Sequence, residues 1–133
     1  MNQVNQSASP DRKRLIGYWI LTALVCLPIG AGGVFDVMAT PEVVEAFTHL
    51  GYPVYFARLL GIAKVLGALA LLAPGLRRVK EWAYAGIMID LIAAAVSHAA
   101  VGDGVDNIAP PLVIALFAVG SYLLRPPTRR LEG

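Results

Sequence analysis

Charged side chains are scarce in this chain. Only 15% of its 133 residues are Asp, Glu, Lys or Arg, whereas 57% are hydrophobic and the mean hydropathy is +0.65. An ordinary soluble domain carries about 25% charged residues. The apolar residues also gather into four long runs. Both features disfavour a soluble domain and indicate a protein that spans a membrane.

Cysteine is nearly absent, and several common motifs are missing. The single cysteine, Cys26, cannot form a disulfide within the chain and offers no C-x-x-C pair, so thiol–disulfide chemistry is disfavoured. The sequence also has no strand pattern, phosphate-binding loop or zinc-finger spacing. No motif therefore identifies a reaction, and enzymatic activity stays an open question at this point.

Four apolar runs predict the fold. They cover residues 15–36, 54–73, 81–101 and 108–124, and Pro110 and Pro111 are expected to open the fourth helix, where missing backbone donors cost least. About 20 helical residues, at 1.5 Å each, cross a hydrocarbon core of about 30 Å. We therefore predict an all-α protein, a bundle of four transmembrane helices over residues 15–124. Residues 1–14 are expected to be a disordered cytoplasmic segment and residues 125–133 a cytoplasmic tail.

The basic residues predict the orientation. All eleven except Arg58 and Lys64 lie before the first run, between the second and third runs, or after the fourth. The other two connections contain Asp and Glu but no Lys or Arg. By the positive-inside rule, both termini and the turn at 74–80 face the cytoplasm. Because spans separate the basic clusters, a nucleic-acid partner is disfavoured.

A short helix is predicted between the first two spans. Thr40 suits an N-cap, Pro41 the first helical position, and Glu42 the first turn. Gly51 and Pro53 end the segment. Residues 41–50 also present a short apolar face, which predicts a helix lying on the exterior membrane interface.

Small residues mark the second half of the first span. Pro28 is followed by Gly30, Gly32 and Gly33, which leave the backbone bare. Close packing on a neighbouring helix is the favoured interpretation. The approach of a ligand to the bare backbone is the alternative.

Two charges lie near the middle of adjacent spans. Folding the chain back at its basic turn brings Lys64 level with Asp90, each on a face of small residues. A charge at a helix centre costs roughly 2.5–3.5 kcal/mol on insertion scales, so we predict that the two side chains pair inside the bundle. The pair could fix the register of two helices, or it could respond to protons or a ligand.

A second group of polar residues is predicted at the exterior end. Three interpretations are open: a structural network in which Arg58 and His98 satisfy carboxylates, a pocket for a small anion or quinone head group, and a metal or haem site. The third is disfavoured because the spacing has no ligand signature such as H-x-x-x-H. The cluster consists of Asp36, His49, Arg58, Ser97, His98 and Asp103.

Several segments resemble the DoxX-like membrane proteins. They are Gly51-Tyr52-Pro53, the run 61–67, the run 80–86 around Trp82, and Ser97-His98 followed by Gly102-Asp103. The resemblance covers about residues 15–124. It implies a four-helix integral protein of the bacterial inner membrane, and some relatives are linked to quinone-coupled thiosulfate oxidation or to membrane redox complexes. It assigns no catalytic residue.

These observations lead to two expectations for function. The first is a non-enzymatic component or partner subunit of a membrane redox or stress-related assembly. The alternative is a quinone-linked oxidoreductase subunit or a small transporter that uses the buried polar core. Quinone is a candidate cofactor, whereas haem and metal are disfavoured. The expected partners are the lipid bilayer, a soluble or membrane redox protein, and a second copy of the chain.

Overall fold

The computed structural model describes residues 2–129, and it describes side chains from Arg12 onward. Residues 2–129 contain no strand, which confirms the all-α prediction. Four helices are long and apolar enough to cross a membrane, and a short helix lies between the first two, as predicted. The elements are α1 (Asn2–Met38), α2 (Pro41–Leu50), α3 (Val54–Leu72), α4 (Arg77–Ala100), α5 (Val105–Leu123) and the 3₁₀ helix η1 (Pro127–Arg129).

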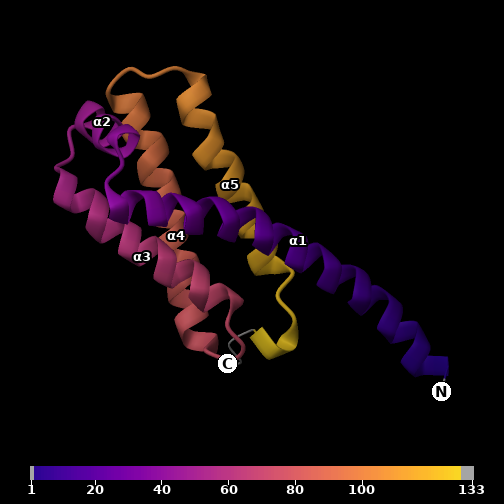
Figure 1. Cartoon of the computed structure of the whole chain (residues 1–133). Helices are drawn as coiled ribbons and strands as arrows, with labels where there is room; N and C mark the ends of the chain where they lie inside the picture. Colours follow the sequence, from indigo (N-terminus) through magenta and orange to yellow (C-terminus); the bar gives the residue numbers. More distant parts are fainter. Residues whose placement is uncertain (1, 130–133) are drawn as a thin grey trace.

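The long helices form a bundle in which α1 lies beside α3 and α4 lies beside α5 (Figure 1). The helix α2 crosses one end of the bundle, which we call the α2 end, and η1 lies at the opposite end, the η1 end. The N-terminal part of α1 extends well beyond the other helices (Figure 1). Residues 130–133 of the predicted tail lie outside the described residues.

The core lies where α1, α3, α4 and α5 meet. It contains Val25, Leu71, Tyr84 and Ala118, all nearly inaccessible. The outer surface carries large apolar side chains instead: Leu27 is 70% exposed and Leu116 is 70% exposed. Such a surface would be unfavourable in water but matches a hydrocarbon solvent, so this protein is in contact with the lipid bilayer.

Three helix boundaries differ from the predicted ones. The helix α1 begins at Asn2 and includes the segment for which we expected disorder. The helix α4 begins at Arg77, so the turn is shorter than 74–80. The helix α5 begins at Val105, which places Pro110 and Pro111 inside it rather than at its start. Both prolines lie near the α2 end, where water can reach the carbonyl groups they leave unpaired.

Basic side chains at the η1 end complete the hydrogen bonding of helix ends. The ammonium group of the buried Lys80 donates to the carbonyls of Ala73 and Gly75. A guanidinium nitrogen of Arg129 donates to the Leu71 carbonyl at 2.7 Å. Helix C-terminal carbonyls lack intrahelical partners, and cations satisfy both the lone pairs and the dipole there.

A buried hydroxyl network also joins three helices. Ser121 of α5 lies 2.6 Å from the Thr22 hydroxyl of α1 and 2.7 Å from the Tyr84 hydroxyl of α4. Hydrogen bonds between helices hold membrane bundles together where burial of apolar surface contributes little. These residues were not predicted from the sequence, because isolated Ser and Thr in apolar runs form no recognisable pattern.

Candidate functional site

A half-open cavity of about 470 Å³ lies between the helices at the α2 end. Its walls are mostly apolar, and its polar lining consists of Tyr52, Lys64, Asp90, Ser97 and His98. Ligand sites in proteins are typically cavities of about 300–1,000 Å³ with apolar walls and a few polar groups. The cavity therefore has the size and the lining of a binding site for a small molecule.

Aromatic rings close the cavity on the side of α2. Tyr52 and Phe56 stack with ring centroids 5.1 Å apart and an interplanar angle of 26°. Phe47 of α2 lies 6.2 Å from the Tyr52 ring. The turn that places Tyr52 there is set locally: Gly51 adopts φ = 88°, a left-handed conformation that ends α2, and Pro53 begins the next helix. The wall is thus built by the short helix and the turn that follows it.

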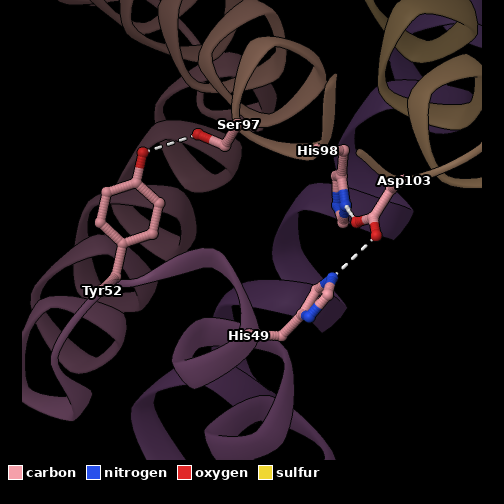
Figure 2. Close-up of polar contacts among 5 residues, drawn as sticks. All are labelled: His49, Tyr52, Ser97, His98 and Asp103. Carbon is pink, nitrogen blue, oxygen red and sulfur yellow. Dashed lines mark hydrogen bonds and ion pairs between the residues drawn. The ribbon is translucent and has the colours of Figure 1, made fainter. Parts of the chain in front are cut away.

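Hydroxyl groups line the cavity at its α2 end. The Tyr52 hydroxyl and the Ser97 hydroxyl are 2.6 Å apart and share a hydrogen bond (Figure 2). Each hydroxyl can donate one hydrogen bond and accept others, so the pair can still bind one more polar group. Ser97 was predicted from the sequence as a site residue, whereas Tyr52 was not. The only signal for Tyr52 was its place in the segment Gly51-Tyr52-Pro53 at the start of a span.

Two histidines converge on one carboxylate beside these hydroxyls. Asp103 accepts from Nε2 of His49 at 2.7 Å and from Nδ1 of His98 at 2.6 Å (Figure 2). These two hydrogen bonds hold the pKa of Asp103 below its usual range. His49 belongs to α2 and His98 to α4, so the carboxylate connects the short helix to the end of a span.

The contact with Asp103 also determines what His98 can offer a ligand. An ionised carboxylate only accepts hydrogen bonds, so Nδ1 of His98 carries the proton. In a neutral ring Nε2 is then an acceptor. Because His98 lines the cavity, this nitrogen is the acceptor it can present to a bound molecule.

At the opposite end of the cavity, Lys64 is paired differently from the prediction. Its ammonium nitrogen lies 3.0 Å from a carboxylate oxygen of Asp36, which is 5% exposed. The predicted ion pair with Asp90 is not formed, since none of the ion pairs among residues 12–129 includes Asp90. Asp90 instead lines the same cavity as Lys64.

Close packing of α1 on α3 explains this pairing. A side chain added at Gly61 would place Cβ 2.5 Å from the Gly33 carbonyl oxygen and 2.8 Å from Cβ of Asp36. The two backbones therefore touch, and Asp36 is brought next to Lys64 from the same contact. The predicted pairing placed α4 opposite Lys64, but α1 approaches α3 closely because both helices carry glycine at the crossing.

The remaining residue of the predicted cluster, Arg58, lies elsewhere. It is exposed, does not line the cavity, and forms no hydrogen bond or ion pair with the described side chains. Side chains two positions apart on an α-helix point about 200° apart around its axis. Arg58 and Leu60 therefore face nearly opposite sides of α3, and Leu60 is the one that lines the cavity. Equal depth in the membrane therefore did not imply contact.

Five of the six predicted residues thus divide into three groups rather than one cluster, and Arg58 belongs to none of them. Asp103 binds both histidines, Ser97 binds Tyr52, and Asp36 binds Lys64. Within the part of the chain that the structure describes, no three His, Cys, Asp or Glu residues are arranged to hold a metal ion.

No curated protein and no solved structure matches this chain. The DoxX-like family matches residues 20–121, a region that contains the cavity lining and all four spans in large part. This multi-pass membrane protein belongs to the DoxX-like family.

Proposed function

We propose that this protein binds a small ligand of the quinone class in the cavity at the α2 end, as a component of a membrane redox assembly. The supporting observation is the division of the cavity into an apolar middle and two polar ends. A quinone has the same division, since a flat apolar ring carries one carbonyl oxygen at each end.

The donors fit the two carbonyls. The hydroxyls of Tyr52 and Ser97 can donate at the α2 end, and the ammonium group of Lys64 can donate at the inner end. Along α4, Ser97 and Asp90 mark these two ends, and seven residues correspond to a rise of about 10 Å. That length is roughly the span of a ring with two carbonyls and a hydrogen bond at each end.

Of the two expectations drawn from the sequence, the cavity favours the ligand-binding alternative. A subunit with a purely structural role in an assembly would have no use for a void lined by polar groups, since empty space in a bundle forfeits packing contacts. Membership of a redox assembly remains part of the proposal and rests on the family resemblance.

Binding to the purified protein tests the proposal. We expect a tail-free benzoquinone, 2,3-dimethoxy-5-methyl-1,4-benzoquinone, to bind the protein in mild detergent, measured by titration calorimetry. Ser97→Ala and Tyr52→Phe should each weaken binding about fivefold, because each removes a hydroxyl donor and one hydrogen bond contributes about 1 kcal/mol. Arg58→Ala is the matched control and should bind normally, since Arg58 does not line the cavity. No binding by the wild type, or an equal loss in the control, contradicts the proposal.

The orientation is a second part of the proposal. We propose that both termini and the η1 end face the cytoplasm, as the basic residues predict. Cysteines introduced at Glu45 and Asp106 should then react with an impermeant reagent on intact cells, whereas a cysteine at Arg77 should not. The reverse pattern would show that the α2 end faces inward.

A further inference from the structure

A groove of about 290 Å³ runs between α3 and α4, next to the cavity. The groove and the cavity share four lining residues: Leu60, Lys64, Gly86 and Asp90. The two spaces therefore meet at mid-span, where the only two charged residues of the groove are found. The remaining lining residues of the groove are apolar or glycine.

Small residues hold this groove open. A Cβ atom added at Gly67 would meet the Ile87 side chain at 3.8 Å, an ordinary contact, and one added at Gly86 would meet nothing within 4 Å. Ala63 and Ala83 also line the groove. Glycine is unfavourable inside a helix compared with alanine, so two glycines that support no close helix contact need another reason to be there.

The groove is long and opens to the surface that faces lipid. From Leu60 to Ala70 the helix rises about 15 Å, half the thickness of a hydrocarbon core of about 30 Å. Two of the side chains on its rim, Leu66 and Trp82, are 61% and 66% exposed. A hydrocarbon chain could therefore lie along α3 and α4 and reach the bilayer without entering water.

The geometry points to a ligand with a hydrocarbon tail, whose head occupies the cavity and whose tail lies in the groove between α3 and α4. This inference rests on the proposed function and deepens it, because it makes the ligand a membrane-borne molecule that arrives from the bilayer. The polar residues at the junction, Lys64 and Asp90, then mark where the head ends and the tail begins.

The position of the polar end separates this occupant from an ordinary phospholipid chain. Lys64 and Asp90 lie near the middle of α3 and α4. A phospholipid keeps its head group at the membrane surface, about half the bilayer thickness away. A polar contact at mid-span suits a molecule whose head is buried in the bundle and whose tail lies in the groove between α3 and α4.

Tail length provides the test. The probes are the tail-free benzoquinone named above and its n-decyl derivative, and each is titrated against wild type and variants in the same detergent. Gly67→Leu and Ala63→Leu fill the groove, and neither residue lines the cavity. Ala85→Leu is the control, since Ala85 lies on α4 but lines a different groove, with α5. Comparing variant with wild type for one compound cancels its partition into detergent.

Substitutions that fill the groove should weaken binding of only the compound with a tail. We expect Gly67→Leu and Ala63→Leu to weaken binding of the decyl compound about tenfold, because the displaced chain loses its packing contacts. Binding of the tail-free compound should change less than about twofold, as for other surface substitutions. Ala85→Leu should bind both compounds normally.

The possible failures are distinguishable. If the tail-free compound binds but groove filling leaves the decyl compound unaffected, the tail lies elsewhere and this inference is wrong, while the proposed function stands. An equal loss for both compounds likewise overturns the tail assignment. If neither compound binds the wild type, the proposed function itself fails and the inference fails with it.

Discussion

Two neighbouring helix pairs use glycine in opposite ways. Between α1 and α3, the backbones at Gly33 and Gly61 touch, and a Cβ atom on either would lie within 3 Å of the other helix. Between α3 and α4, a Cβ atom at Gly67 would meet Ile87 only at an ordinary contact distance, 3.8 Å, and one at Gly86 would meet nothing within 4 Å. The same residue type therefore closes one interface and opens the other. The comparison shows that a small-residue face does not specify which helix will approach it, or whether any will.

The charged residues at mid-span also differ between the α1–α3 interface and the α3–α4 interface. The closed interface provides Lys64 with its partner, Asp36, while the open one leaves Asp90 beside a cavity. If the closed interface is structural and the open one serves a ligand, substitutions in the first should affect folding and substitutions in the second should affect binding.

The largest effect is expected at Gly61. Gly61→Ala would place Cβ 2.5 Å from a backbone oxygen of α1, and backbone cannot rotate away as a side chain can. Overpacking of this kind costs typically 1–3 kcal/mol, and we expect the upper part of that range or loss of accumulation in the membrane. Thermal unfolding in detergent measures the change. Gly86→Ala is the control and should be neutral or slightly stabilising, because its Cβ meets nothing within 4 Å.

A smaller but more specific effect is expected for the ion pair. Lys64→Met or Asp36→Leu alone strands a charge inside the bundle. The cost should be about 2 kcal/mol, below the roughly 3–5 kcal/mol of a fully buried pair, because the Lys64 side chain is 19% exposed. The double variant Lys64→Met/Asp36→Leu should recover much of this loss, whereas Lys64→Met/Asp90→Leu should not. Thermal stability of all five proteins measures the coupling. If Lys64→Met/Asp90→Leu recovers the lost stability instead, then Lys64 pairs with Asp90, as the sequence predicted.

The smallest effect is expected at Asp103, and it depends on pH. The pKa of this carboxyl is lowered by its hydrogen bonds from His98 and His49. A lowered pKa in the folded state means that ionised Asp103 stabilises the fold above its unfolded value, about 3.9, and that this contribution is lost as pH falls through the folded value. Asp103→Asn should therefore lower the melting temperature at pH 7, and this effect should shrink as the pH falls from about 3.9 through the lower pKa of the folded state.

A matched control separates this bond from general acid effects. Asp106 lies near Asp103, is exposed, and forms no ion pair with the described side chains. Asp106→Asn removes only an exposed carboxylate from the first turn of α5, so it should lower the melting temperature at pH 7 less than Asp103→Asn does. If both substitutions behave alike, the two histidine contacts do not contribute to stability.

The sequence was sufficient for the architecture because the signals involved are local. Runs of about 20 apolar residues specify spans without reference to other helices, and the Thr40-Pro41-Glu42 start and the Gly51-Pro53 stop specify α2. The same segment displays an N-cap bond from Val43 to the Thr40 hydroxyl at 3.4 Å. Helix boundaries were less accurate where proline was taken as a start signal, at Pro110 and Pro111.

The site could be predicted only in part. Ser97 and His98 were selected, and both line the cavity, but Tyr52 was not, because nothing local indicates that its hydroxyl meets Ser97. Arg58 was selected by its depth in the membrane, which is a one-dimensional property. Depth says how far along a helix a residue lies, and the contacts of a side chain depend also on the direction in which it points.

The sequence by itself thus determined the family, the four spans and the short helix, since each depends on composition and neighbours along the chain. The tertiary structure decided that Lys64 pairs with Asp36, that one glycine face closes while the next stays open, and that a cavity joins the groove. These outcomes depend on the rotation and approach of whole helices. A few backbone contacts at Gly33 and Gly61 control that approach, because only there can α1 and α3 come close enough to exclude the competing partner.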